Sequence, residues 1–329
     1  MTKHTRSHAA AANAATLRLP SDMTVATTSQ AATAEATARP SESHLLTDAL
    51  LLLMAIIWGV NFSVLKYATT FLAPLAFNGV RIPTAAAAQF GLARAMRLPS
   101  VPPAIVRRLI LLGMLGNGVY QVLFILGVVR SLVATTALLV AVTPAYMAIL
   151  GRLFGREQLS RRNWTGIACQ IAGCATVVLG SARSADGRDS LSGVAMLLAG
   201  SLSWAIYSVI LRRYSDQVHV VQIGGYTMIG GAIVNCTLAL PFMIRTDWTA
   251  LPAGVWLALL YSSLLAMVAA YLFWYRGLRV LGPTRTAVYS NLQPIIAGLV
   301  AFLVLREIPT GPQYVGAALI IAGLLLTRR

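Results

Sequence analysis

Long apolar runs alternate with short polar links from about residue 46 to the C-terminal end. Each run approaches the ~20 residues with which an α-helix crosses the hydrocarbon core of a bilayer. The third and fourth runs are separated only by Arg130 and Ser131, but one helix of about 50 residues would be too long for a bilayer. The pattern therefore predicts an all-α integral membrane protein with ten transmembrane helices, at 46–67, 72–94, 106–129, 132–153, 163–181, 191–211, 220–244, 252–275, 284–305 and 311–327.

Composition argues against a soluble domain and against an enzyme. Of 329 residues, 57% are hydrophobic and 11% are charged, whereas a soluble domain carries about 25% charged residues. The three cysteines fall inside apolar runs, and the four histidines fall in the N-terminal segment or in a link, so no cluster of metal ligands forms within the predicted membrane region. A GxxxxGK[ST] phosphate loop is also absent from the sequence. We therefore expect no enzyme, no cofactor and no metal.

Residues 1–44 differ from the rest of the chain. They are rich in Ala, Thr and Ser and contain no long apolar core. Such a segment is neither a cleavable signal peptide nor a stable domain. We expect a disordered N-terminal tail on the cytoplasmic side.

The second half of the chain repeats the first at a spacing of 150 residues. Identical residues recur at this spacing, among them Pro144/Pro294, Glu157/Glu307, Gly166/Gly316 and Gly173/Gly323. We assign five helices to each repeat, at 45–182 and 190–329. Because five is an odd number, the second repeat enters the membrane from the opposite side. Inverted repeats of this kind are the usual build of secondary transporters.

Basic residues indicate the orientation. The chain has 26 Lys and Arg against 10 Asp and Glu, but they are spread along the links, which argues against a nucleic-acid partner. With both termini in the cytoplasm, nineteen basic residues fall on the inner side and six on the outer side, as the positive-inside rule requires. We expect this topology in the inner (plasma) membrane, with the lipid bilayer and a small-molecule substrate as partners.

The first and sixth helices each carry a tryptophan in mid-segment. Trp58 is followed three residues later by Asn61, and Trp204 by Tyr207. Residues three apart share a helix face, so these side chains either line a cavity or make contacts between helices, for which Gly59 would permit a close approach. A tryptophan at mid-bilayer lies outside the interfacial belt. This favours cavity lining for both tryptophans. For Asn61, cavity lining and a contact between helices remain equal alternatives.

Arg81 is the charged residue that lies farthest from any link. An ionisable side chain within a membrane is costly and indicates a functional site by default. No Asp or Glu lies centrally in any predicted helix. Arg81 therefore either binds an anionic group of the substrate, extends to one membrane face, or bonds backbone carbonyls.

The third and eighth helices carry further polar candidates at matching places. Gln121 and Tyr271 are 150 residues apart, and Tyr120 and Trp274 lie beside them. All four are candidates for a substrate cavity. Packing of aromatic rings between helices is the alternative for each.

Two prolines fall in mid-helix, Pro144 and Pro294. Each removes a backbone hydrogen bond, kinks its helix and frees a carbonyl. The kinks either shape a central site or serve packing only. Thr143 and Gln293 precede the prolines and are the nearest polar candidates.

Two glutamates, Glu157 and Glu307, each follow one of these prolines by thirteen residues. They are candidates for a gate or a proton-linked carboxylate. Both fall at predicted helix ends rather than at mid-bilayer, which favours a structural ion pair.

Small residues recur in the fifth and tenth helices. Besides the repeated glycines, Ala168-x-x-x-Ala172 matches Ala318-x-x-x-Ala322. Small residues on one face permit close helix packing. We expect a structural contact or a homodimer interface there.

The order and duplication of these residues resemble the EamA family of the drug/metabolite transporter superfamily. The matching residues are Trp58-Gly59-x-Asn61-Phe62, Phe77-Asn78-x-x-Arg81, Pro144 with Glu157 and Gly166, Trp204-Ala205-x-Tyr207, the stretch 256–277, and Pro294 with Glu307 and Gly316. The resemblance covers about 46–327 and omits the N-terminal tail. It implies two antiparallel five-helix bundles around a cavity lined by helices one, three, four, six, eight and nine.

The same resemblance implies alternating access without nucleotide hydrolysis. It favours an exporter of small metabolites, such as amino acids or related compounds, but the family shares no substrate motif. A passive channel or facilitator and an importer are the alternatives. A scaffold or sensor fits poorly, because the loops are short and no soluble domain is present.

We predict that Arg81→Ala impairs transport more than Arg130→Ala, because only Arg81 is placed deep in the membrane. The expected loss is about tenfold or more, as for a charge-assisted hydrogen bond. Uptake by purified protein in liposomes measures it. Equal, mild effects of the two substitutions would refute the ranking.

Overall fold

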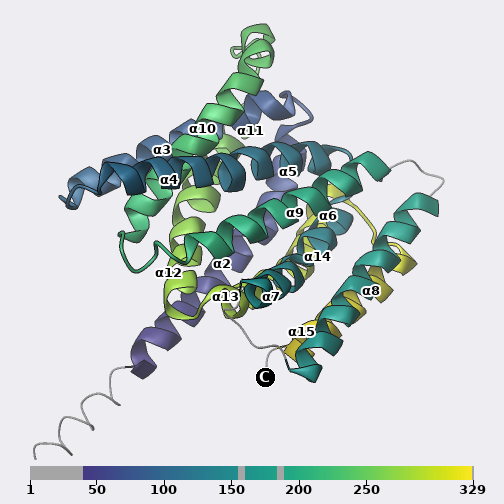
Figure 1. The fold of residues 1–329 in the computed structure, drawn as a ribbon. Helices are drawn as coiled ribbons and strands as arrows, with labels where there is room; N and C mark the ends of the chain where they lie inside the picture. Colours follow the sequence, from purple (N-terminus) through teal and green to yellow (C-terminus); the bar gives the residue numbers. More distant parts are fainter. Residues whose placement is uncertain (1–39, 155–159, 184–188, 328–329) are drawn as a thin grey trace, which may run out of the picture. The chain divides into compact units, whose positions relative to one another are not determined.

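Ten helical segments make up the part of the chain that the structure describes. The computed structural model describes residues 40–154, 160–183 and 189–327. Helices suit a membrane because they satisfy their own backbone hydrogen bonds, which hydrocarbon cannot do. The elements are α2 (Pro40–Ala68), α3 (Pro74–Ala95), α4 (Pro103–Gly113), η1 (Met114–Val119), α5 (Tyr120–Val129), α6 (Val133–Val140), α7 (Thr143–Leu153), α8 (Arg161–Arg183), α9 (Leu191–Leu211), α10 (Val220–Arg245), α11 (Ala253–Leu260), η2 (Tyr261–Ala269), α12 (Ala270–Val280), α13 (Pro283–Ser290), α14 (Gln293–Val300), η3 (Ala301–Leu305) and α15 (Gly311–Thr327) (Figure 1).

The predicted all-helical, ten-helix fold is confirmed. The third helix comprises α4, η1 and α5, the fourth α6 and α7, the eighth α11, η2 and α12, and the ninth α13, α14 and η3. Within the described ranges, seven helical spans are long and apolar enough to cross a membrane by length and composition. The helices outside this set are α3, which carries Arg81, α8, and α15, which has 17 residues. The predicted N-terminal tail lies outside the described residues.

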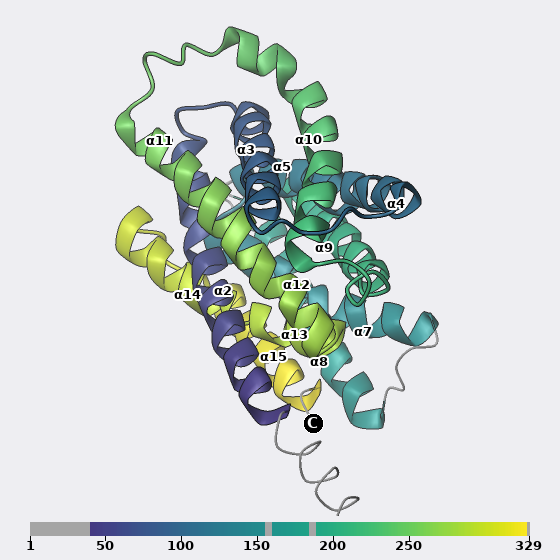
Figure 2. The same cartoon turned by 90° about the vertical axis from the view of Figure 1, so that its left-hand side faces the viewer.

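Equivalent helices of the two halves lie side by side. The second helices, α3 and α10, pack along one another, and so do the fifth helices, α8 and α15 (Figures 1 and 2). The first helices, α2 and α9, meet through Trp58 and Trp204, whose rings lie edge to face at 6.2 Å. These three helices thus each contact their own counterpart, as elements close to a two-fold axis between the halves would.

Glycines bring α8 and α15 into backbone contact. A Cβ atom added to Gly173 would lie 2.7 Å from the carbonyl oxygen of Gly316, and one added to Gly316 would lie 2.8 Å from that of Gly173. Gly323 is packed in the same way on the carbonyl of Gly166. The glycine stripe therefore serves packing within the molecule.

The alanines of the same two helices face outward. Ala168, Ala172, Ala318 and Ala322 are all exposed on the surface of the described chain. A homodimer through this alanine stripe stays a prediction.

The third and eighth helices depart from α-helical geometry at matching places, η1 and η2. A π-helical turn changes the carbonyl pairing of its helix. The carbonyls of Asn117 and Met267 are 150 residues apart in sequence. Each accepts a hydrogen bond from a side-chain amide of the opposite half. Asn235 Nδ2 donates to the first at 3.1 Å and Gln89 Nε2 to the second at 3.1 Å.

The fourth and ninth helices break at their prolines. One helix stops at Val140 and resumes at Thr143, and the other stops at Ser290 and resumes at Gln293. Pro144 has no N–H for the carbonyl of Val140, and the Thr143 hydroxyl donates to that carbonyl instead, at 2.6 Å. The freed backbone group is therefore satisfied next to the break.

We predict that Gly316→Leu destabilises the protein, because the added side chain collides with the α8 backbone. Overpacking of this kind costs roughly 1–3 kcal/mol, so the unfolding temperature in detergent should fall by several degrees. Ala318→Leu, on the exposed face of the same helix, is the control and should change it little. Equal unfolding temperatures for the two variants would contradict the packing assignment.

Candidate functional site

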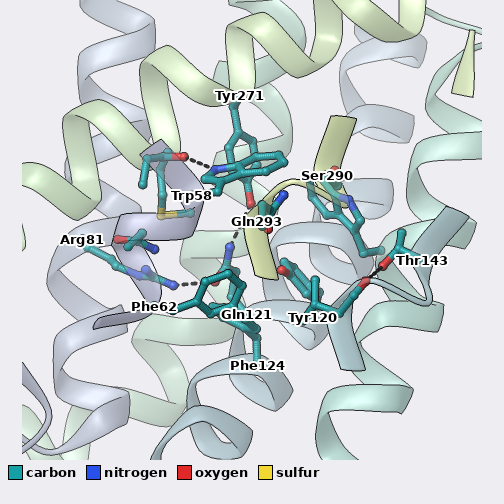
Figure 3. A pocket seen from close by; sticks show the side chains of 15 residues that line it. Trp58, Phe62, Arg81, Tyr120, Gln121, Phe124, Thr143, Tyr271, Ser290 and Gln293 are labelled. Atoms are coloured by element: carbon teal, nitrogen blue, oxygen red, sulfur yellow. Dashed lines mark hydrogen bonds between the residues drawn. The ribbon is translucent and has the colours of Figure 1, made fainter. Parts of the chain in front are cut away.

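A narrow cavity lies where seven of the ten helical segments converge (Figure 3). Its volume is about 40 Å³, enough for water but too small for a metabolite. A substrate would therefore need the helices to move apart. The lining residues are Trp58, Asn61, Phe62, Arg81, Tyr120, Gln121, Phe124, Val140, Thr143, Trp204, Ala266, Met267, Tyr271, Ser290 and Gln293.

Most of the sequence-derived cavity candidates come together here. Nine of them line the cavity: Trp58, Asn61, Arg81, Tyr120, Gln121, Thr143, Trp204, Tyr271 and Gln293. Tyr207 and Trp274 do not line it but pack behind Trp204, with ring centroids 5.0 and 5.6 Å from it. Pro144 and Pro294 set the helix breaks beside Thr143 and Gln293.

Aromatic rings form one wall of the cavity. Trp204 lies 5.1 Å from Tyr120 and 5.3 Å from Tyr271 between ring centroids, and Trp58 lies 5.6 Å from Tyr271. The indole N–H of Trp58 donates to the carbonyl of Ala266 in η2 at 2.8 Å. The π-helical turn thus holds a tryptophan of the opposite half in place.

Arg81 is buried in α3, with 1% of its surface exposed, so it does not extend to a membrane face. Its guanidinium donates to the side-chain oxygen of Gln121 and to Ser262 Oγ, the latter at 2.8 Å. It also lies over the ring of Phe77, 5.7 Å from the centroid, a cation–π geometry. Nε finds no partner, and the described chain shows no carboxylate paired with this cation.

Gln121 connects the charge to the aromatic wall. Its amide oxygen accepts from Arg81 while its amide nitrogen donates to the Tyr271 hydroxyl at 2.8 Å (Figure 3). The backbone carbonyl of Gln121 accepts from Asn78 Nδ2 at 2.9 Å. Gln121 and Tyr271, which are 150 residues apart in sequence, are therefore hydrogen-bonded to each other across the two halves. Through Gln121, both side chains are positioned by Arg81.

Asn61 and Gly59 have separate roles in the structure. A Cβ atom at Gly59 would lie 2.7 Å from Ile296 of α14, so this glycine allows the close approach between helices. Asn61 lines the cavity, and its buried side-chain oxygen has no hydrogen-bond partner among the described residues. It remains an open acceptor at the cavity wall.

Sequence patterns missed Ser262, which binds Arg81, and several residues that line the cavity. Phe62 entered only as part of the family motif, and Phe124, whose ring centroid lies 5.7 Å from that of Phe62, carries no distinctive spacing. Ser290 is the exception. It stands four residues before Pro294, so a search for polar residues one turn before each helix-breaking proline would have found it.

Glu307 does not line the cavity. It lies in the link after η3, where its carboxylate accepts the backbone N–H of Val133 at 2.9 Å, at the start of α6. Asp189 accepts the N–H of Leu132 at 2.7 Å at the same helix end. Two carboxylates thus face the positive end of the α6 dipole. Glu157 lies outside the described residues.

Lys66 completes this charged group. Its ammonium donates to the carbonyls of Ser131 and Val128 at 2.7 and 3.2 Å, and it lies close enough to Glu307 and Asp189 for electrostatic interaction. The turn between α5 and α6 is therefore held from three separate segments. In the described ranges, no group of three His, Cys, Asp or Glu could hold a metal ion.

Comparison with known protein families identifies the family to which this fold belongs. Two regions, residues 45–179 and 191–329, each match the EamA-like transporter family. The chain belongs to this family. It is a multi-pass membrane transporter rather than an enzyme, and its two family repeats correspond to the two five-helix halves.

Three relatives span most of the chain. The uncharacterized transporter YyaM of Bacillus subtilis is 27% identical over 86% of this chain and 93% of its own length. A probable amino-acid metabolite efflux pump of Salmonella typhimurium is 28% identical over 84% and 93%. The uncharacterized inner membrane transporter YedA of Escherichia coli is 30% identical over 74% and 78%.

One solved crystal structure shares the fold. It is 19% identical to this chain, covers 84% of it and 94% of its own chain, and superposes with a TM-score of 0.62. At this identity the likeness concerns the fold alone.

We predict that Glu307→Gln keeps at least about half of the transport rate, because a glutamine oxygen can still accept the N–H of Val133 as a cap does. Glu307→Ala, which removes the acceptor, should lower stability by about 1 kcal/mol. Proteoliposome transport and thermal unfolding measure the two effects. Complete loss of pH-driven transport by correctly inserted Glu307→Gln protein would instead assign a proton-linked role.

Proposed function

We propose that this protein is a secondary transporter that exports small metabolites, amino acids or related compounds, by alternating access. It acts across the inner membrane, with both termini in the cytoplasm. The substrate carries a carboxylate, which Arg81 binds in the central cavity.

Arg81 is the observation that carries this proposal. A buried cation is expensive in a membrane unless an anion or hydrogen bonds compensate it. In the described chain, its guanidinium donates to the neutral side chains of Gln121 and Ser262, and its Nε is unsatisfied. A guanidinium also suits a planar carboxylate, to which it donates two parallel hydrogen bonds. An anionic substrate group would supply the missing countercharge.

The remaining wall suits the other end of an amino acid. An ammonium group binds well over the faces of Trp and Tyr rings, and Trp58, Trp204 and Tyr271 line the cavity. The open acceptor of Asn61 can take one of its protons. A zwitterion would thus be recognised at both ends, in agreement with the relative named a probable amino-acid metabolite efflux pump.

Several features favour alternating access over a passive channel. The cavity is narrow, at about 40 Å³, and its two broken helices stand at matching places of the two halves. Matching breaks let each half bend in the same way at opposite sides of one site. The inner membrane follows the location given for the relative YedA, and the topology follows the excess of arginine on one side.

Counterflow into proteoliposomes tests the proposal. Liposomes preloaded with a mixture of the common amino acids should take up labelled members of that set, and the methyl ester of the best substrate should compete far less well. A charge-assisted hydrogen bond contributes about 1.5–3 kcal/mol, so the expected difference is about ten- to hundredfold. Arg81→Ala should remove the discrimination and Arg130→Ala should keep it.

Two outcomes would count against the proposal. Equal competition by the amino acid and its methyl ester would contradict binding of the carboxylate by Arg81, and flux without counterflow would favour a channel.

The direction of transport is checked in cells. The substrate should accumulate in the medium with the intact protein but not with Arg81→Ala protein at equal membrane abundance, whereas accumulation inside would indicate an importer.

A further inference from the structure

A second hollow opens between α7, α9 and α13. It has a volume of about 370 Å³ and is lined by Met147, Gly151, Val209, Arg212, Arg213, Asp216 and Pro283. This is far larger than the central cavity at about 40 Å³. We call it the arginine cleft.

The arginine cleft lies on helices that also line the central cavity. α7 contributes Thr143 to the cavity and Met147 to the cleft, and α9 contributes Trp204 to the cavity and Val209 to the cleft. The separations of four and five residues correspond to roughly 6–8 Å along a helix. The cleft is therefore about one helical turn from the cavity along two of its walls.

An apolar layer separates the two spaces. Met147 and Val209 are buried, with 0% and 2% of their surfaces exposed, and belong to the same hydrophobic cluster as Trp204 and Tyr271. Methionine is the most adaptable apolar side chain, since it is unbranched and has three rotatable bonds. Rotation of Met147 would cost little compared with movement of a whole helix.

The charge of the cleft is positive and partly unneutralised. Arg212 Nη1 donates to Asp216 Oδ2 at 2.6 Å and to Ser215 Oγ at 2.8 Å. Arg213 is exposed, and no partner of its guanidinium occurs in the described chain. Two arginines against one aspartate leave a surplus cation in a hollow, where low-dielectric walls concentrate the field.

The opposite end of the bundle is built differently. There Lys66 is bonded to two carbonyls and lies near Glu307 and Asp189. The charge of Lys66 is therefore already balanced, and its ammonium group holds the turn between α5 and α6. The positive-inside rule explains why arginines occur at one end, but not why two of them line a cleft beside the cavity.

We propose that the arginine cleft is the loading vestibule of the transporter. Arg213 attracts the carboxylate of the substrate. Arg212 also binds this carboxylate once it has displaced Asp216. The substrate then passes Met147 and Val209 to reach Arg81. The substrate class rests on the proposed function. The positive charge of the cleft and its access to the cavity are argued from the cleft itself and do not depend on that function.

Charge-selective labelling tests the vestibule without transport. Met147→Cys is prepared in protein whose Cys169, Cys174 and Cys236 are replaced by alanine. The thiolate is then treated with anionic 2-sulfonatoethyl or cationic 2-trimethylammonioethyl methanethiosulfonate, each of which forms a mixed disulfide and releases methanesulfinate. The ratio of anionic to cationic rate constants should fall about tenfold when both Arg212 and Arg213 are changed to Gln, in line with electrostatic steering.

Matched controls separate local charge from overall charge. Arg279→Gln removes an exposed arginine of α12 that does not line the cleft, and it should leave the ratio unchanged. Raising the salt from about 0.01 M to about 1 M, which shortens the Debye length from ~30 Å to ~3 Å, should reduce the anionic preference. No reaction with either reagent, or a ratio that the double substitution does not change, would overturn the vestibule.

Transport kinetics test whether the substrate uses this route. With the amino acid that shows the strongest counterflow, Arg212→Gln/Arg213→Gln should raise KM about tenfold with little change in kcat, while Asp216→Asn should lower KM. Unchanged KM values would overturn the route. Because labelling needs no substrate, loss of the anionic preference in the double variant would still support the cleft if carboxylate transport itself failed.

Discussion

The need to satisfy every backbone hydrogen bond in hydrocarbon governs this structure. A regular helix meets that need by itself, so departures from it are confined to places where other groups can compensate. The described helices depart at η1, η2, η3 and the two proline breaks, and all of these except η3 adjoin the central cavity. Side chains of the opposite half donate hydrogen bonds to carbonyls of η1 and η2. The irregularities that shape the cavity therefore also join the two halves.

A single buried cation organises the polar side of that cavity. Arg81 draws in Gln121 and Ser262 from two other helices, and Gln121 in turn holds the hydroxyl of Tyr271. Removing one member of such a network leaves its partners buried and unpaired, which costs more than the bond contributes. The network is neutral apart from Arg81. An anionic substrate group would compensate the positive charge of Arg81, which this network leaves unpaired.

The two ends of the bundle are unequal although the halves are repeated. Repetition gives both ends the same helices, but the charged side chains differ. Lys66, Asp189 and Glu307 close one turn through backbone hydrogen bonds, whereas Arg212 and Arg213 surround a hollow. The repeat thus supplies the symmetry that the proposed alternating access needs. A few charged side chains make the two ends differ in their electrostatics.

Sequence alone determined the ten helices, the duplication and the EamA family, because apolar length and a 150-residue repeat are properties of the chain. It also placed polar residues such as Gln121 and Tyr271 in mid-helix. It could not decide that these two bond to each other, that Ser262 completes the Arg81 network, or that the glycines pack within the molecule. Those contacts join distant segments. They depend on helix rotation and crossing, which only packing of the whole bundle decides.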